Sequence, residues 1–299
     1  MAEIIGCIAL SHGPQLLMPP EKWQDLPTRV REPLAEKPEL ARELTPEVKQ
    51  VKFKRCREAM DFLHRRLDEW NPDAVIIIGD DQTENILDDN TPPFLVYIGE
   101  QANATLKFEY LGEPATSQMT LYKTRPVFAL SVIEGLMQRG FDPAWSKTTR
   151  YKAGMGHAFG RPLHFIMPDR RYPIVPIMVN TYFPPAPTAE RCFQFGKALF
   201  SALKECREVD KVVVVGSGGL SHVMIDEKLD RGFINALETY NERYMAAMSS
   251  DVLVEGTSEI RNWIITAAVA GKGATMVDYV PCYRTMHGIG CAMGFAYWS

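Results

Sequence analysis

Histidine, carboxylate and amide side chains follow four apolar runs of the sequence. The runs, residues 4–10, 74–78, 174–179 and 211–215, are rich in β-branched residues, which is typical of buried strands. The polar residues that follow them are His12, the trio Asp80, Asp81 and Gln82, then Asn180 and His222. Ligands bind outside the carboxyl ends of the strands in an open α/β sheet. If the four strands are parallel neighbours, we expect these side chains to share one crevice.

Imidazole and carboxylate groups gathered in this way could hold a metal ion or move protons. His157 is a further candidate, because the glycines around it predict a loop that could approach a ligand closely. Glu259 could supply a carboxylate from the first turn of a helix that runs to about residue 270. That position also has a structural explanation, because Thr257 or Ser258 could cap this helix and the helix dipole favours an acid there.

Helical patterns separate the apolar runs. Residues 46–70 form a long amphipathic pattern that begins after Thr45, a good N-cap, and residues 188–206 repeat the arrangement. Strands that alternate with helices predict an α/β fold. We expect one domain over residues 1–299, with a mostly parallel central sheet flanked by helices and the site at the carboxyl ends of the strands.

Three further segments complete the predicted organisation. Residues 94–99 and 104–110 have the pattern of shorter strands, which could form a hairpin or an edge of the sheet. Residues 19–44 are rich in proline and charge. We interpret this last segment as a surface excursion of the single domain and not as a linker between domains.

The composition is that of an ordinary globular protein, with 299 residues, 46% of them hydrophobic and 23% charged. A net charge of −4 gives no electrostatic footprint for nucleic acid or for an anionic membrane. The sequence has no run of roughly 20 apolar residues, and Glu3 stands where a secretory signal would carry basic residues. The six cysteines form no zinc or redox motif. We therefore expect a cytoplasmic protein with reduced thiols and with no nucleic-acid or membrane partner.

Several motifs resemble those of a known enzyme family. They are "SHGPQLLMPPEKW", "GDDQTEN", "NTYFPP", "GSGGLSHVMIDEKLDRG", "GTSEIRNW" and the last 22 residues, "DYVPCYRTMHGIGCAMGFAYWS". Together the motifs resemble the class III extradiol ring-cleavage dioxygenases, whose type member is the catalytic chain of protocatechuate 4,5-dioxygenase. The branch known as 3-O-methylgallate dioxygenase-like is the most similar, and the resemblance spans nearly the whole chain.

The resemblance implies a set of site residues. In this family two histidines and one glutamate hold a non-haem Fe(II), and a third histidine serves as acid and base. By position, His12 matches the first metal ligand, Glu259 the carboxylate ligand and His222 the acid/base. The second histidine ligand of the family is missing, because its place falls in the trio Asp80, Asp81 and Gln82. Gln82 is the positional match, and Asp81 or His157 could take its place; loss of the metal is a further alternative.

The resemblance also implies the reaction, which is ring opening of a small catecholic aromatic by O2. Compounds of the protocatechuate, gallate or O-methylgallate type are the expected substrates. The candidates for substrate binding are His157, Asn180, Tyr283 and Arg284, with Arg161 as a second cation that could pair with a substrate carboxylate. Two other functions stay open, an O2-independent metal-dependent lyase or hydrolase and a metal-free binding or partner subunit. The sequence also allows a homo-oligomer.

Overall fold

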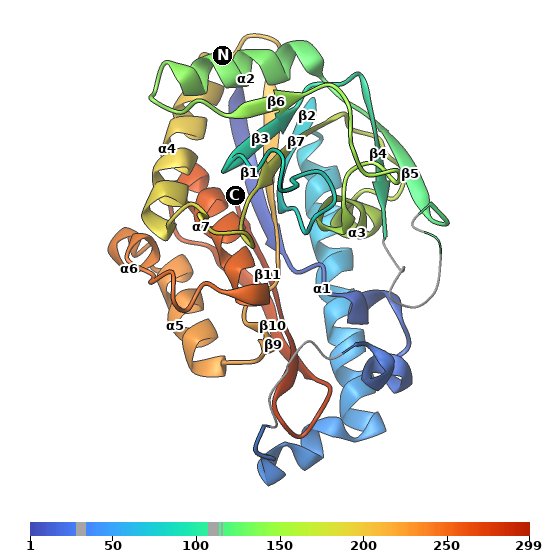
Figure 1. The fold of residues 1–299 in the computed structure, drawn as a ribbon. Helices are drawn as coiled ribbons and strands as arrows, with labels where there is room; N and C mark the ends of the chain where they lie inside the picture. The colour runs from blue at the N-terminus through green and yellow to red at the C-terminus, as the bar shows by residue number, and fades with distance from the viewer. Residues whose placement is uncertain (28–33, 107–113, 115) are drawn as a thin grey trace.

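Four parallel strands form the centre of the sheet in the computed structural model (Figure 1). The structure describes residues 1–27, 34–106, 114 and 116–299. The central strands are β1 (Glu3–Leu10), β8 (Lys211–Ser217), β2 (Ala74–Asp80) and β7 (Ile174–Val179), adjacent in that order. They are the four strands that the apolar runs predict. The mostly parallel central sheet is therefore confirmed.

The sheet continues at both edges with strands that are mostly antiparallel to their neighbours. In the described residues it has nine strands, ordered β10-β11-β1-β8-β2-β7-β3-β6, with β9 paired to β11. The outer strands are β3 (Phe94–Tyr97), β6 (Ala144–Ser146), β9 (His222–Met224), β10 (Thr275–Tyr283) and β11 (Ile289–Trp298). The sequence pattern does not predict β10 and β11. Proline and aspartate interrupt β10, and small residues such as Gly290 and Gly294 alternate along β11, so neither strand has a strong propensity signal.

Helices cover both faces of the sheet (Figure 1). Residues Ala74, Ile76 and Ile78 of β2 point to the layer that contains α2 (Pro126–Met137), α4 (Ala189–Glu205) and α7 (Ile260–Ala270). Val75 and Ile77 point to the opposite layer, which contains α1 (Pro46–Trp70) and α3 (His157–Ile166). Because alternate side chains of a strand point to opposite faces, a strand buried on both faces needs a continuous apolar run.

The two long helices begin where their caps predict. The Thr45 hydroxyl accepts a hydrogen bond from the amide of Val48 at the start of α1, and Thr188 does the same for Arg191 at the start of α4. The prediction of a loop at His157 was wrong, because this residue is the first of α3. The remaining helices are α5 (Glu227–Glu238) and α6 (Glu242–Ala246), with the 3-10 helices η1 (Pro14–Leu17), η2 (Pro20–Asp25), η3 (Pro38–Leu44) and η5 (Glu255–Glu259).

The segment interpreted as a surface excursion packs through Trp23, which is buried and donates its indole N–H to the carbonyl of Gln15. The second short strand expected at 104–110 starts earlier, as β4 (Gln101–Thr105), and pairs with β5 (Met119–Lys123). Its expected end at 107–110 lies outside the described residues. Among the helices described, none combines the length and the apolar character that a membrane crossing requires.

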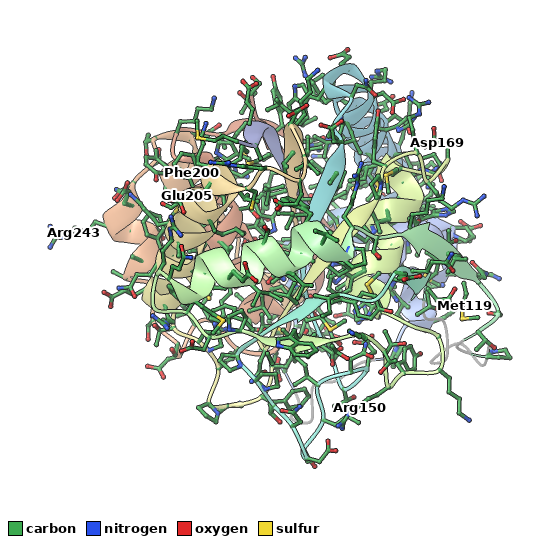
Figure 2. All side chains as sticks on the ribbon, turned by 90° about the horizontal axis from the view of Figure 1, so that it is seen from above. Met119, Arg150, Asp169, Phe200, Glu205 and Arg243 are labelled. Atoms are coloured by element: carbon green, nitrogen blue, oxygen red, sulfur yellow. The ribbon has the colours of Figure 1, made fainter. Side chains whose placement is uncertain are left out.

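The α2 helix lies across the top of the molecule when it is seen from above (Figure 2). Phe200 and Glu205 of α4 lie to one side of α2, and Met119 of β5 lies to the other. This end of the sheet is opposite to the carboxyl ends of β1 and β8. All six cysteines are buried free thiols, in agreement with the expectation of reduced cysteines.

Close contact between α4 and α7 fixes the helix that follows Glu259. A methyl group added at Gly196 of α4 would lie 2.4 Å from the carbonyl oxygen of Ile265 and 2.6 Å from the Cβ of Ala268, both in α7. We expect Gly196→Ala to lower the free energy of unfolding by about 1–3 kcal/mol, because the helices must separate. Urea denaturation measures the change. Ser201→Ala, elsewhere on α4, is the control and should stay within about 0.5 kcal/mol; equal effects of the two changes would contradict close packing as the cause.

Candidate active site

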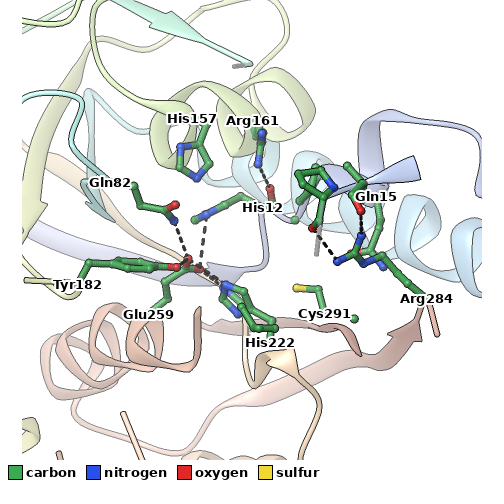
Figure 3. Close-up of a pocket in the computed structure, with 17 residues that line it drawn as sticks. His12, Gln15, Gln82, His157, Arg161, Tyr182, His222, Glu259, Arg284 and Cys291 are labelled. Atoms are coloured by element: carbon green, nitrogen blue, oxygen red, sulfur yellow. Dashed lines mark hydrogen bonds and ion pairs between the residues drawn. The ribbon is translucent and has the colours of Figure 1, made fainter. Parts of the chain in front are cut away.

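A cavity lies at the carboxyl ends of the central strands (Figure 3). His12, Gln82, His222 and Glu259 line it, together with His157 from α3. These residues come from distant parts of the sequence, and the parallel strands bring them to one edge of the sheet. Of the residues that the strand ends predict, His12, Gln82 and His222 line the cavity, whereas Asp80, Asp81 and Asn180 do not belong to its lining.

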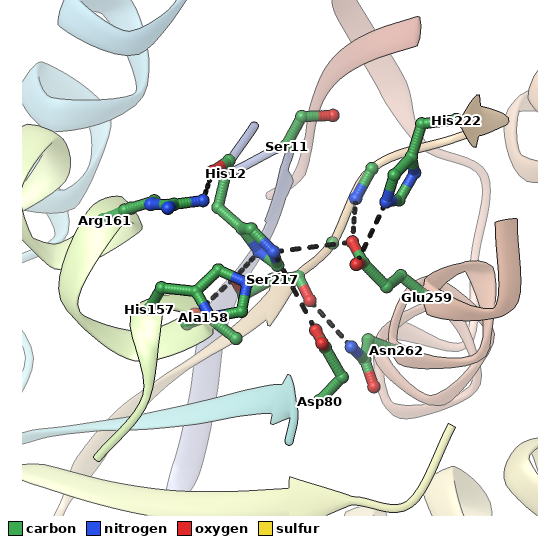
Figure 4. A network of polar contacts seen from close by, with 12 residues as sticks. Ser11, His12, Asp80, His157, Ala158, Arg161, Ser217, His222, Glu259 and Asn262 are labelled. Atoms are coloured by element: carbon green, nitrogen blue, oxygen red, sulfur yellow. Dashed lines mark hydrogen bonds and ion pairs between the residues drawn. The ribbon is translucent and has the colours of Figure 1, made fainter. Parts of the chain in front are cut away.

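His12 is held in one orientation by a chain of two hydrogen bonds (Figure 4). The Ser217 hydroxyl donates to the carbonyl of Ala158, so its oxygen accepts the hydrogen bond from Nδ1 of His12, at 2.8 Å. This arrangement places the lone pair of His12 on Nε2, which lies 3.5 Å from a carboxylate oxygen of Glu259 and 3.9 Å from Oδ1 of Asp80. Burial lowers the pKa of His12 to about 3 against the opposing effect of Glu259. The imidazole is therefore neutral and presents Nε2 to the two carboxylates.

Asp80 and Asp81 are adjacent in sequence but have different surroundings. Oδ1 of Asp80 is buried and has no hydrogen-bond partner among the described residues. Burial, together with Glu259 and Glu84, raises the pKa of Asp80. Asp81 instead accepts hydrogen bonds from three successive backbone amides, those of residues 84, 85 and 86, at 2.8–3.0 Å. Asp81 therefore holds the turn after β2, and the structure does not favour it as a metal ligand.

Gln82 bridges the two carboxylates that lie near His12. Its side-chain amide donates to Oδ2 of Asp80 at 3.2 Å and to Oε1 of Glu259 at 3.3 Å. The backbone amide of Gln82 donates to Glu84 at 2.7 Å, which fixes the turn that carries the side chain. Gln82 thus lines the cavity as a donor between two negatively charged groups.

His157 forms a buried pair with Glu84. Nδ1 of His157 lies 2.7 Å from Oε1 of Glu84, and the two side chains are 7% and 1% exposed. Gly156 allows this approach, because a Cβ there would lie 2.4 Å from the Glu84 carboxyl carbon. The rings of His157 and His12 are perpendicular, with centroids 5.1 Å apart. Glu84 therefore fixes the orientation of a second imidazole beside His12.

Glu259 accepts hydrogen bonds at both of its oxygens. Oε1 accepts from Gln82, from the Tyr182 hydroxyl at 3.1 Å and from Nε2 of His222 at 3.1 Å. Oε2 accepts from the backbone amide of Gly219 at 2.8 Å. Burial opposes ionisation, but the neighbouring histidines and these donors prevail and hold the pKa of Glu259 well below its usual range.

Neither Thr257 nor Ser258 caps the helix that follows, contrary to what the sequence had suggested. Residues Glu255–Glu259 form the 3-10 helix η5, α7 begins at Ile260, and the described residues provide no side-chain cap for it. The side chain of Glu259 points into the cavity instead. Side chains of α7 bind the carbonyls at the end of β8, which holds Glu259 beside that strand.

His222 uses both ring nitrogens as hydrogen-bond donors. Nδ1 lies 2.9 Å from the carbonyl oxygen of Leu220, which only accepts, and Nε2 faces the Glu259 carboxylate. Burial alone would lower the pKa of His222, but Glu259 and the carbonyl raise it above its ordinary value. Gly219 and Gly256 both approach the ring, because a Cβ at either position would lie within 2.6 Å of it. The site therefore holds a charged imidazole in a narrow slot.

The residues expected to bind substrate occupy different places. Arg284 lines the cavity. Its guanidinium donates to backbone carbonyls in η2 and just after it, including that of Leu26 at 2.7 Å. Arg161 also lines the cavity and donates to the carbonyl of His12. Asn180 and Tyr283 are not part of the cavity lining: Asn180 binds the backbone of the turn after β7, and Tyr283 donates to a side chain of α5. These two residues support the surrounding structure.

Two of these residues were not predicted from the sequence, and Asp80 had no predicted role of its own. Glu84 and Ser217 fix the histidines, and Asp80 supplies the carboxylate oxygen that lacks a partner. Ser217 could have been considered, because it closely follows the predicted strand 211–215, as His12 follows the predicted strand 4–10. Glu84 could not be assigned to His157, since 73 residues separate the two and no local pattern links them.

The donor atoms around His12 fit a metal ion. Within the described residues, ligand atoms of His12, Asp80 and His157 lie within 4.8 Å of one another, and all three residues are buried. A buried carboxylate oxygen that lacks a donor, next to an imidazole lone pair, is the arrangement that a cation would stabilise. Imidazole and carboxylate ligands suit divalent transition metals such as iron.

Comparisons with known proteins identify the family of this chain. A family model described as the catalytic LigB subunit of aromatic ring-opening dioxygenase matches residues 6–294. A 2,3-dihydroxyphenylpropionate/2,3-dihydroxicinnamic acid 1,2-dioxygenase 2 of Pseudomonas putida is 31% identical over 166 residues, which cover 55% of this chain and 48% of that protein. The gallate dioxygenase of Pseudomonas putida is 38% identical over 84 residues, which cover 27% of this chain and 24% of that protein.

The matches cover enough of the chain to assign its family, but too little of the relatives to assign its substrate. The chain spans about half the length of the first of these relatives, so their substrates are not transferred to it by the match itself. The family model, in contrast, covers the chain from the middle of β1 to β11 and includes every residue of the cavity. The chain therefore belongs to the family of the catalytic LigB subunit of aromatic ring-opening dioxygenases.

Proposed function

We propose that this protein is an Fe(II)-dependent extradiol dioxygenase that opens the ring of a small catecholic aromatic with O2. The observation that carries the proposal is the pairing, in one cavity, of a cation-binding cluster around His12 with a charged acid, His222, on the other side of Glu259. Membership of the ring-opening family supports the same reaction. Compounds of the gallate, protocatechuate or O-methylgallate type are the proposed substrates, and the cytoplasm is the proposed location.

His12 would hold the metal together with a neighbouring carboxylate, in a site closed by α3 and by the loop after β2. The set His12, Gln82 and Glu259 is the one that family resemblance implies. Bound Fe(II) would supply the electron chemistry with O2 and would lower the pKa of a substrate hydroxyl. The other requirements of the reaction fall to groups of the chain, which must bind the ring, orient it and move protons.

His222 would exchange a proton at Nε2. Nδ1 donates to the carbonyl of Leu220, so the ring keeps its orientation whether or not Nε2 carries a proton. Glu259 stabilises the protonated ring at 3.1 Å. Deprotonated, Nε2 can take a proton from a substrate hydroxyl; protonated, it can return one when the ring opens. Arg161 and Arg284 would favour a substrate that carries a carboxylate, since both cations line the cavity.

Oxygen uptake tests the proposed function. Protein purified without oxygen and loaded with Fe(II) should consume O2 on addition of gallate, protocatechuate or 3-O-methylgallate, with one ring opened for each O2. A matched aromatic acid with a single hydroxyl is the control and should give no uptake, because ring opening needs two adjacent oxygens. Iron-loaded protein that consumes no O2 with any of the three catecholic compounds would contradict the proposal.

Replacement of His222 should remove the acid and leave the metal. We expect His222→Gln to lower kcat by about 10²–10⁴-fold, the usual contribution of general acid/base catalysis. Iron content, measured on the same preparation, should stay at the wild-type level. Unchanged kcat at full iron content would exclude His222 from proton transfer.

Displacement of the His222 ring should also slow the reaction. A Cβ at Gly256 would lie 2.0 Å from Cδ2 and 2.3 Å from Nε2 of His222, so Gly256→Ala must move the ring. We expect kcat to fall by roughly 100-fold, as small displacements of a reacting group do. The melting temperature should change little, because the imidazole can rotate toward the cavity. Wild-type kcat in this variant would show that the slot does not position the ring.

A further inference from the structure

Ser221, the residue before His222, has a hydrogen-bond partner for each of its polar groups. Its amide and its hydroxyl both donate to the carboxylate of Asp230, at 2.8 and 2.7 Å. The hydroxyl oxygen also accepts from the amide of Asp226 at 2.8 Å, and the carbonyl accepts from the amide of Ala292 at 2.9 Å. Contacts with α5, with its N-cap and with β11 therefore fix the backbone immediately before His222.

Asp230 is a carboxylate of α5 that is 0% exposed. Burial of a carboxylate costs free energy unless hydrogen-bond donors compensate for it. Two of its donors belong to Ser221, and the third is the hydroxyl of Tyr279 in β10, at 2.7 Å. Displacement of Ser221 would leave the buried carboxylate short of two donors, which is costly. Asp230 therefore opposes movement of the residue that precedes His222.

Val223, the residue after His222, has a backbone conformation that its side chain disfavours. Its φ is 67°, in the left-handed region, where a β-branched residue is rare. A disfavoured conformation persists only where the surroundings determine it. The pairing of the three-residue strand β9 with β11 holds the chain on one side of Val223. Asp230 holds the chain on the other side, through Ser221.

We propose that Asp230 is a positioning residue for His222. By fixing Ser221, Asp230 holds the left-handed turn at Val223 and so keeps the imidazole in its narrow slot. Asp230 is not part of the cavity lining, so it acts through the backbone and not by contact with a substrate. The inference rests on the proposed function for the reaction that His222 serves, and on geometry for the position of the ring.

A second carboxylate of α5 provides a matched control. Glu227 accepts a hydrogen bond from the hydroxyl of Tyr283 in β10 at 2.9 Å, as Asp230 does from Tyr279. Both pairs join α5 to β10, but only the pair of Asp230 includes Ser221. Glu227→Gln therefore weakens the contact between α5 and β10, whereas Asp230→Asn also weakens the support of Ser221.

NMR spectroscopy of metal-free protein follows the position of the His222 ring without any measurement of activity. Nδ1–H of His222 donates to the carbonyl of Leu220 at 2.9 Å, which slows exchange of this proton with water. In 15N-labelled protein we expect a ring N–H signal that is absent from His222→Gln. Asp230→Asn should shift this signal or broaden it, and Glu227→Gln should leave it in place. An unchanged signal in Asp230→Asn would overturn the proposal.

Turnover of the Fe(II)-loaded enzyme, with the catecholic compound that the wild type opens, gives a second measurement. We expect Asp230→Asn to lower kcat by about 10–100-fold, the usual loss for a residue that orients a reacting group from behind. KM should stay within about 3-fold of the wild-type value, because substrate binding is not affected. Ser221→Ala removes the hydroxyl but keeps the amide bond, so kcat should fall by about 3–10-fold.

The control and the iron content decide the cause of the loss. Glu227→Gln should keep wild-type kcat, and Asp230→Asn should keep wild-type iron content. Equal losses of kcat in Glu227→Gln and Asp230→Asn would show that the contact between α5 and β10 is responsible, and would overturn the proposal. Wild-type protein that consumes no O2, together with the expected ring signals, would overturn the proposed function alone.

A double-mutant cycle tests the route through the turn. Glycine adopts a positive φ without steric penalty, so Val223→Gly removes the disfavoured conformation that Asp230 helps to hold. We expect the loss of kcat caused by Asp230→Asn to be at least about 3-fold smaller in the Val223→Gly background. Equal losses in the two backgrounds would show that Asp230 does not act through this turn, and would overturn the proposal.

Discussion

Burial of negative charge around His12 is the constraint on which the rest of the site depends. Asp80, Glu84 and Glu259 are 0%, 2% and 1% exposed, and an ionised carboxylate taken from water costs several kcal/mol unless it is compensated. Glu84 has His157 as its partner, and Glu259 has His222 and three neutral donors. Among the described residues, Asp80 accepts one side-chain hydrogen bond, from the amide of Gln82. Its other oxygen lies 3.9 Å from Nε2 of His12 and has no hydrogen-bond partner among these residues.

The three histidines differ in their surroundings because the Nδ1 atom of each is hydrogen-bonded to a different kind of group. Ser217 is a neutral partner and leaves His12 neutral, with a lone pair directed at the carboxylates. Glu84 is a charged partner that fixes His157 on the other side of the cluster. A backbone carbonyl holds His222, so that its other nitrogen faces Glu259 and can carry a proton. The hydrogen bond behind each ring thus sets which nitrogen faces the carboxylates and whether it carries a proton.

Close packing of backbone against side chains holds these groups in position. Glycines allow three close approaches at the site: Gly156 to the Glu84 carboxylate, Gly256 to the His222 ring, and Gly218 to the backbone of Glu259. A Cβ at any of these positions would lie within 3.0 Å of its neighbour. The glycines of the motifs around these residues are therefore needed for contact distance.

The sequence by itself determined the four central strands, the long helices α1 and α4, and the meeting of His12 and His222 at one edge, whereas only the family resemblance assigned Glu259 to the same site. These features depend on local signals: continuous apolar runs, N-caps, and the rule that parallel strands end on one side. Only the tertiary structure decided that Asp81 binds the backbone amides of the turn after β2 while Asp80 lies beside Nε2 of His12, because the second contact joins two different strands. It also paired Glu84 with His157 and placed β11 beside β1, since contacts between distant segments leave no periodic signal in the chain.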